Sequence, residues 1–436
     1  MSSSTKFLPD FVLRLICYGW FFLIILINYY ITHGWYSEPE NLLLENIPLD
    51  CDPILNNRTE AKKYKKWYFS SNHVENELGG EDFCETVHKY FLFEKTALSD
   101  EEKNFPLAYG LIVYHDIVQV LLQVSVFYQP QNQFCFTVDE FATDGFKKMM
   151  MKVPSCFKNM ATFIGQNSAW GSFGIVENMY NCVDYLATSN KEWKYFQYLS
   201  GSDIPIRTNL EMVRVMQALN GSINTDVELI ESNRLNHLRT IDPPLNLYKG
   251  SMSVALPREA ANYIVRSKKA KTLLDFLSNT IIPDESVWTS LGGNKNELAV
   301  PGSFNAKDIM YLRHHKKLKA VDIHTVDHVG SSFIARYQVW WTQPGCKGKM
   351  KSASCVFGIG DVPIILKRPE LVAHKIYRTY QPAALMCLIK ELRRRSYNPV
   401  NFDATSYSEM PTVELHNGRS LDEITHPDWV RMSSFT

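Results

Sequence analysis

Continuous apolar runs alternate with amphipathic stretches between residues 105 and 220. The stretch 107–114 is apolar throughout, as expected of a strand that is buried on both faces. The next stretch, 116–127, has a broad apolar stripe and predicts a helix. The other elements predicted in this region are strands at 134–138, 161–164 and 193–199 and helices at 146–151, 174–187 and 210–219. This alternation predicts an α/β fold, a parallel sheet with helices on both faces.

Polar side chains directly follow two of these predicted strands. Asp139 follows the strand at 134–138, and Asp203 lies in the polar stretch after the strand at 193–199. In parallel α/β sheets, ligands bind at the carboxyl ends of the strands, so the sequence predicts a binding site at this edge. The second half of the chain is more mixed, and its predicted elements are short strands at 251–256 and 355–357 and helices at 257–266, 271–279 and 382–395.

The N-terminal region contains a candidate membrane span. Residues 15–32 carry no charge, and a helix of this length extends ~27 Å. Tyr29 and Tyr30 lie near its far end, where membrane-interface aromatics are common. Basic residues precede the span and acidic residues follow it, which predicts a cytosolic N-terminus. A cleaved signal peptide is the alternative, but the apolar region is long and no small-x-small cleavage site follows it.

These observations predict four regions along the 436 residues. Residues 1–10 form a cytoplasmic tail and 11–32 a transmembrane signal anchor. The polar, charged stretch 33–104 has few periodic apolar runs and is interpreted as a lumenal stem. Residues 105–436 form the catalytic domain, which is long enough to bury a sizeable core.

Composition and cysteine usage agree with this topology. The 46 basic and 46 acidic residues balance, so nothing indicates a nucleic-acid-binding protein, and 45% hydrophobic residues exclude a disordered chain. Apart from Cys17 in the span there are eight cysteines, an even number without a Cys-x-x-Cys pair, which favours disulfides in an oxidising lumen over zinc ligation. Asn57 and Asn220 begin two N-x-S/T sequons, candidate glycosylation sites in the same compartment.

Five segments carry a resemblance to a known family. They are residues 134–139 (FCFTVD), 193–211 (WKYFQYLSGSDIPIRTNLE), 248–251 (YKGS), 283–288 (PDESVW) and 355–361 (CVFGIGD). In this order the chain resembles the core-2/I-branching family of β-1,6-N-acetylglucosaminyltransferases. The resemblance implies a GT-A-like fold with a Rossmann-like donor half, and Golgi residence as a single-pass type II membrane protein. It also implies inverting transfer from UDP-GlcNAc to an O-glycan of a glycoprotein, with no metal or other cofactor.

The resemblance identifies Glu285 as the catalytic residue. An inverting transfer needs one base that removes the proton of the attacking hydroxyl as C1 of the donor is displaced. Pro283 and Asp284 are typical of a helix start, so Glu285 is expected in a first turn, where the helix dipole favours the charged carboxylate. The alternative is an ordinary first-turn glutamate.

Two donor-binding residues follow from the same resemblance. Asp139 matches an aspartate that holds the nucleotide, and Lys375 matches a cation that neutralises the leaving diphosphate. The alternatives are a solvated strand-end carboxylate and a solvated surface lysine. The usual metal-binding Asp-x-Asp pair does not follow the strand at 134–138, which agrees with a family that works without metal.

One departure from the family pattern lies in the loop between Cys346 and Cys355. The family's second cation, an arginine, falls on Ser352 here. We therefore expect Lys351 or Lys349 to replace it, or the diphosphate to be held more weakly. Trp170 is a further candidate on the donor side.

Acceptor residues are less well defined. Asp226, Glu228 and Arg234 lie in the segment where the family binds the acceptor, and they are candidates to hold sugar hydroxyls. Tyr337 and Trp340 are candidate stacking platforms for a sugar ring, although core packing is the favoured interpretation of both.

The family also implies a disulfide framework, Cys51–Cys387, Cys84–Cys156, Cys135–Cys182 and Cys346–Cys355. The family's extra cysteine corresponds to Ser200, so no lumenal thiol is left over. Two other functions stay open: a related transferase with another donor or acceptor, such as xylose transfer, and an inactive glycan-binding protein. The acceptor glycan is not determined by the sequence, and a homodimer stays open.

Overall fold

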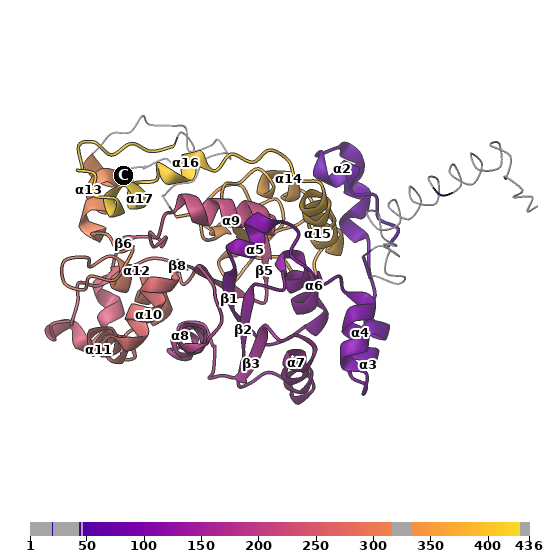
Figure 1. The fold of residues 1–436 in the computed structure, drawn as a ribbon, viewed down its shortest axis with the longest axis horizontal. Coiled ribbons are helices and arrows are strands. Elements are labelled where there is room, and N and C mark those ends of the chain that lie inside the picture. Colours follow the sequence, from indigo (N-terminus) through magenta and orange to yellow (C-terminus); the bar gives the residue numbers. More distant parts are fainter. Residues whose placement is uncertain (1–19, 21–42, 45–46, 316–332, 428–436) are drawn as a thin grey trace, which may run out of the picture. The chain divides into compact units, whose positions relative to one another are not determined.

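A computed structural model describes residues 43–44, 47–315 and 333–427, together with Trp20 (Figure 1). Contacts divide the chain into residues 1–42 and the unit from Leu43 onward. The predicted membrane span lies outside the described residues apart from Trp20. Among the helices that are described, none combines the length and apolar character that crossing a bilayer requires.

A five-stranded sheet forms the centre of the larger unit. Its order is β3 (Met160–Ile164), β2 (Gln133–Val138), β1 (Leu107–Val113), β4 (Tyr195–Ser200) and β8 (Ala255–Pro257). The first four strands are parallel, and β8 pairs antiparallel with β4. The predicted α/β architecture with a parallel sheet is therefore confirmed.

Helices cover both faces of this sheet (Figure 1). Tyr109 and Leu111 of β1 pack in one core cluster with α6 (Ile117–Phe127) and α7 (Asp144–Cys156). Ala108 and Ile112 point to the opposite face and pack with α8 (Gly174–Thr188) and α10 (Arg258–Arg266). Because β1 is buried on both faces, it has the continuous apolar sequence from which it was predicted.

The described part of the predicted stem is folded onto this unit. It forms α2 (Asp52–Leu55), η1 (Thr59–Lys66), α3 (Asn72–Leu78), α4 (Phe83–Tyr90) and α5 (Asp100–Asn104). Ile54, Val74 and Val87 are fully buried and belong to the same core cluster as β1. The sequence did not predict these helices because each is too short for a periodic apolar stripe to be recognised.

Four disulfides hold the unit together, with the same pairing that the resemblance implies: Cys51–Cys387, Cys84–Cys156, Cys135–Cys182 and Cys346–Cys355. The first two attach the N-terminal segment to α15 (Pro382–Tyr397) and α7. The third joins β2 of the sheet to α8, which packs on one face of it.

The chain after β4 contributes very short strands. A three-stranded sheet has the order β5 (Asp203–Pro205), β12 (Val372–His374), β9 (Tyr337–Gln338). Two ribbons pair β6 (Glu228–Leu229) with β7 (Tyr248–Lys249) and β10 (Lys349–Lys351) with β11 (Ser354–Val356). Strands of two or three residues leave almost no pattern in a sequence, so of these only the region of β11 was predicted.

The remaining helices connect these ribbons. They are α9 (Asn209–Ala218), η2 (Ser232–Thr240), α11 (Lys268–Leu277), η3 (Pro283–Glu285), α12 (Val287–Gly292), α13 (Ala306–His315), α14 (Val362–Ile365), α16 (Thr405–Ser408) and α17 (Pro411–His416). Of these, α9 and α11 lie where helices were predicted.

Candidate active site

The Asp139 carboxylate is held rigidly at the carboxyl end of β2. It is buried, and its two oxygens accept hydrogen bonds from the backbone N–H groups of Phe141, at 2.7 Å, and Ser168, at 2.6 Å. Asp139 is thus a fixed group at the edge where the sequence predicted a ligand.

The loop after β3 extends from Asp139 toward Glu285. Ser168 contacts Asp139, and three residues later Gly171 lies against Ile282, so close that a Cβ on the glycine would be 3.5 Å from the Ile282 side chain. Trp170 lies between these two contacts and is 78% exposed. Trp170 is therefore in a position to contact a ligand, and it does not pack in the core.

Glu285 lies at the end of η3, directly before α12. Its carboxylate is 2.8 Å from Nη2 of Arg234, and its backbone C=O accepts a 2.6 Å hydrogen bond from the N–H of Gly250. The sequence predicted a helix start, but the residue lies in a single 3-10 turn. Because the dipole of one turn is small, the ion pair with Arg234 is the contact that holds the carboxylate in place.

Arg234 connects Glu285 to a second carboxylate. Its Nε is 2.6 Å from Glu231, which also forms an ion pair with Lys249. Nη1 of Arg234 is buried and has no hydrogen-bond partner among the residues that the structure describes. Nη2 of the guanidinium therefore holds Glu285, and Nη1 is available for a hydroxyl of a ligand.

The other two acceptor candidates lie near this group. Glu228 faces Lys249 across the β6–β7 ribbon. The carbonyl oxygen of Asp226 accepts a hydrogen bond from Thr289 of α12 at 2.7 Å, and it lies where a Cβ on Gly250 would be. Asp226 and Glu228 thus lie beside Lys249 and Gly250, and the N–H of Gly250 bonds the backbone of Glu285.

Asp284 differs sharply from its neighbour Glu285. Burial, and then the adjacent charge of Glu285, raise the pKa of Asp284 to about 7. Its Oδ1 has no hydrogen-bond partner within the described part of the chain. The sequence did not single out Asp284, because only burial distinguishes the two carboxyls.

A second charged group surrounds Lys375, directly after β12. Lys375 is buried, and its Nζ donates a 2.8 Å hydrogen bond to the carbonyl oxygen of Lys351. Burial, and then the charge of Lys351, lower the pKa of Lys375. The two lysines are thus neighbours, which makes a paired cation site for an anion.

The β10–β11 hairpin gives different neighbours to the two lysines that are candidates to replace the missing arginine. Ser352 and Ala353 form its tip, at φ of 50° and 57°, as in a type I′ turn. The amine of Lys351 lies 5.3 Å from the ring centre of Tyr377, whereas that of Lys349 lies 4.3 Å from the ring of Tyr380. Of the two lysines in the hairpin, Lys351 is the one beside Lys375.

Two residues that the sequence analysis did not single out lie between Asp139 and the lysines. Tyr114 and His115 directly follow β1, and their rings stack at 4.0 Å. Burial, and then the charge of Asp139, raise the pKa of Tyr114. Burial lowers the pKa of His115, the nearby Asp116 opposes that shift, and Lys351 adds to it. Their position after a parallel strand was the available signal.

The two aromatic acceptor candidates have different environments. Tyr337 is buried, with its ring stacked on Phe357 at 5.4 Å and on the guanidinium of Arg368 at 4.4 Å. Tyr337 therefore packs in the core, the interpretation favoured from the sequence. The backbone of Trp340 forms an isolated β-bridge with Ser354. The residue is 39% exposed, so its ring stays available for stacking.

Asn57 and Asn220, the two sequon asparagines, are both exposed and both have a positive φ. The Asn220 side chain donates to Asn417 at 3.3 Å, and Ser222 of its sequon is fully buried.

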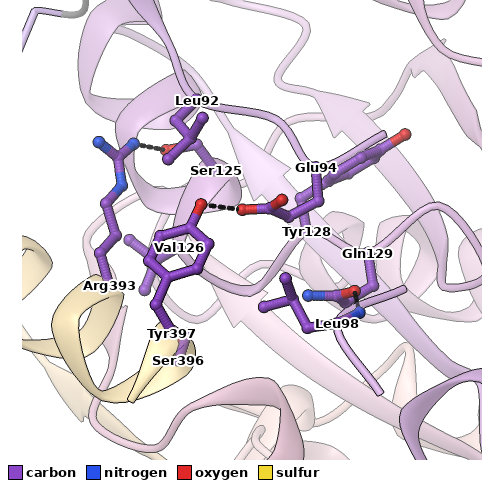
Figure 2. Close-up of a pocket in the computed structure, with 10 residues that line it drawn as sticks. All are labelled: Leu92, Glu94, Leu98, Ser125, Val126, Tyr128, Gln129, Arg393, Ser396 and Tyr397. Atoms are coloured by element: carbon purple, nitrogen blue, oxygen red, sulfur yellow. Dashed lines mark hydrogen bonds between the residues drawn. The ribbon is translucent and has the colours of Figure 1, made fainter. Parts of the chain in front are cut away.

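Figure 2 shows a small pocket elsewhere in the unit, between α6 and α15. Its volume is about 10 Å³, which suffices for about one water molecule. Polar contacts such as Arg393 to Ser125 and Tyr397 to Glu94 span it. None of the candidate site residues lines this pocket, and it is too small for a sugar. Separately, no group of three or more His, Cys, Asp or Glu among the described residues is arranged to hold a metal ion.

The family model described as "Core-2/I-Branching enzyme" matches residues 107–327, about half of the chain. The chain belongs to the core-2/I-branching enzyme family. The match begins at β1 and includes Asp139, the Asp226–Arg234 segment and Glu285, so the group around the candidate base lies inside the family domain. Lys351 and Lys375 lie beyond it.

Curated relatives cover most of the chain. The human "Beta-1,3-galactosyl-O-glycosyl-glycoprotein beta-1,6-N-acetylglucosaminyltransferase" is 28% identical over 344 residues, which are 72% of this chain and 76% of the relative. A human relative with the same name and the number 3 is 28% identical over 374 residues, covering 79% and 80%. The mouse "N-acetyllactosaminide beta-1,6-N-acetylglucosaminyl-transferase" is 29% identical over 327 residues, covering 69% and 76%.

Membership in the branching-enzyme family confirms the enzyme class predicted from the sequence, that of the β-1,6-N-acetylglucosaminyltransferases. The mixed α/β architecture with its parallel sheet is compatible with the GT-A-like fold that the resemblance implied.

Proposed function

We propose that this branching enzyme transfers N-acetylglucosamine from UDP-GlcNAc in β-1,6 linkage to an O-glycan, with inversion and without a metal ion. The observation that carries the proposal is the position of Glu285. It pairs with Arg234 at 2.8 Å, and η3 contacts the loop after β3 through Ile282 and Gly171. Ser168 of this loop also bonds Asp139, so one loop contacts both the proposed nucleotide-binding residue and the segment directly before the proposed base.

In the proposed reaction the Glu285 carboxylate removes the proton from the acceptor hydroxyl while its oxygen attacks C1 of the donor. The C1–O bond to UDP breaks on the opposite side, which inverts the configuration and leaves UDP with one additional negative charge. Lys375 and Lys351 stabilise that charge, because they are adjacent and one of them is buried. The acceptor hydroxyls are held by Arg234, Asp226 and Glu228.

Asp139 and Trp170 complete the proposed donor site. Because Asp139 is fixed by two backbone N–H groups, its carboxylate is a rigid acceptor for N–H or O–H groups of the nucleoside. Trp170, exposed on the connecting loop, presents a face for a sugar ring. We place this enzyme in the Golgi membrane, with residues 11–32 as the anchor and the catalytic unit in the lumen.

Transfer assays on the full-length chain in detergent test this function. UDP-GlcNAc, UDP-xylose and other UDP-sugars are offered with core-1, core-3 and poly-lactosamine acceptors, with and without EDTA. GlcNAc transfer in β-1,6 linkage that survives EDTA is the expected result. Transfer of another sugar would show a related transferase, and glycan binding without transfer from any donor would show an inactive lectin-like protein.

A further inference from the structure

Lys375 is connected through its neighbour His374 to a buried charged group. His374 faces Asp203 across the β12–β5 pair, and Nδ1 of His374 lies 2.7 Å from Oδ1 of Asp203. The other oxygen of Asp203 accepts from Nη2 of Arg336, at 2.7 Å, and from the backbone N–H of Ser200, at 2.6 Å. The Asp203 side chain is completely buried, and that of Arg336 is nearly so.

The charges of these residues determine which atom is the donor in the hydrogen bond between His374 and Asp203. Burial alone would raise the pKa of Asp203, but Arg336 and then His374 bring it below its usual value, so Asp203 is an anion. Burial lowers the pKa of His374, although Asp203 opposes the shift, and a carboxylate can only accept a hydrogen bond. The Nδ1–H of His374 therefore donates to Asp203, and Arg336 supplies the countercharge.

The backbone of Lys375 pairs with β11, where its C=O accepts from the N–H of Phe357 at 2.9 Å and its N–H donates to the C=O of Cys355 at 3.3 Å. Its amine hydrogen-bonds the carbonyl oxygen of Lys351 and faces the like charge of that lysine. Two neighbouring ammonium groups repel each other, so the direction of the Lys375 side chain depends on how firmly the backbone before it is held. The bond between His374 and Asp203 holds that backbone from the side of β5.

We propose that His374 and Asp203 are positioning residues that hold Lys375 beside Lys351 for the diphosphate of the donor. This inference rests on the proposed function, because it takes the diphosphate of UDP as the ligand of the two lysines. His374 does not act on the substrate. Its hydrogen bond to the buried Asp203–Arg336 pair fixes the backbone next to Lys375.

Two substitutions of His374 test the role. His374→Leu removes the donor to Asp203, whereas His374→Asn retains an N–H close to the position of Nδ1. Binding of UDP and of uridine, which lacks phosphates, is measured for each variant of the full-length chain by calorimetry or NMR. The exposed His73→Leu in α3 is the matched control, and thermal unfolding shows whether each variant folds.

We expect His374→Leu to weaken UDP binding about tenfold, because a displaced charged group loses much of its contact with a ligand. Uridine binding should stay unchanged, and His374→Asn should retain UDP affinity within about threefold of the wild type. Asp203→Asn should weaken UDP binding as His374→Leu does, if the variant folds.

Three results would overturn the inference. UDP binding that survives His374→Leu would show that Lys375 needs no anchor. An equal loss of UDP and uridine would show that His374 only supports the fold. A loss in His374→Asn as large as in His374→Leu would show that the imidazole itself contacts the diphosphate. A wild-type chain that does not bind UDP would instead overturn the proposed function, and this inference with it.

Discussion

Two adjacent carboxyl groups, Asp284 and Glu285, differ in environment in a way suited to different roles. Glu285 is partly exposed and paired with Arg234, whereas Asp284 is buried with its pKa raised to about 7. A base must reach the substrate, and of the two carboxyls only that of Glu285 is partly exposed.

Replacement of Glu285 by Gln should lower the transfer rate by about 10³-fold, since general base catalysis contributes roughly 10²–10⁴. UDP affinity should stay within about twofold, because the variant keeps the size of the side chain and Asp139 and the lysines are unchanged. Turnover assays and UDP titration measure the two effects, with the exposed Glu259→Gln in α10 as control. Retained turnover would refute the assignment of the base.

Asp284 should make stability depend on pH. Its pKa is about 7 in the folded chain against 3.8 for an unperturbed aspartate, so the folded chain binds a proton that the unfolded chain releases. The protonated carboxyl contributes to the free energy of unfolding. This contribution is fully present below about pH 4 and is lost as pH rises to about 7, and the free energy of unfolding then falls by at most ~1.4 kcal/mol per pH unit. Compared with the wild type, Asp284→Asn should become progressively more stable between pH 5 and pH 7 in denaturant unfolding. Parallel curves for the two proteins would contradict this pKa.

At the scale of elements, very short strands and turns orient the site. The β10–β11 hairpin turns at Ser352 and Ala353, and it places Lys351 beside Lys375 while Lys349 lies over Tyr380. Side chains two positions apart on a strand share a face but lie ~7 Å apart along it, so the two lysines have different neighbours.

The hairpin predicts unequal effects for its two lysines. Lys351→Ala should weaken UDP binding about tenfold, as expected for loss of one charge-assisted contact of ~1.5 kcal/mol. Lys349→Ala should change it by less than about threefold and serves as the matched control. Calorimetric titration with UDP compares the two. Equal losses would show that Lys349 shares the anion site.

Gly250, in the turn after β7, is required by close packing. A Cβ there would collide with the carbonyl oxygen of Asp226 and Oγ1 of Thr289, and the Gly250 N–H holds the Glu285 backbone. Gly250→Ala should therefore cost ~1–3 kcal/mol of stability and also lower the transfer rate. Thermal unfolding and turnover assays measure both, and Gly145→Ala in α7, where a Cβ meets nothing within 4 Å, is the control.

On the scale of the whole molecule, the site depends on segments that are far apart in sequence. Asp139 follows β2, Glu285 ends η3 and Lys375 follows β12. Disulfides hold the outer segments in place. The longest, Cys51–Cys387, joins residues 336 positions apart and fastens the N-terminal segment to α15.

Removal of Cys51–Cys387 should destabilise the unit by ~2–5 kcal/mol, because a long loop of the unfolded chain is no longer constrained. The Cys51→Ser, Cys387→Ser double variant tests this in thermal or denaturant unfolding. Removal of Cys346–Cys355, which closes a loop of only nine residues, should cost less. An equal or smaller loss for the long loop would show that local packing, not loop closure, dominates.

Long regular elements could be predicted from the sequence because they carry their pattern locally. The run from residue 107 identified β1, and the stripe after it identified α6, since a strand buried on both faces and an amphipathic helix each repeat a recognisable period. The resemblance likewise identified Glu285, Asp139 and the disulfide pairs, because those positions lie in short, ordered segments.

What only the tertiary structure decided are the properties that depend on neighbours distant in sequence. The sequence could not show that Asp284 is buried with a raised pKa, or choose between Lys351 and Lys349. Nor could it connect Asp203 to His374, 171 positions later. Burial and electrostatic coupling arise only when separate segments meet, so the order of residues determined the sheet and the candidate chemistry, whereas folding determined the charge and partner of each side chain.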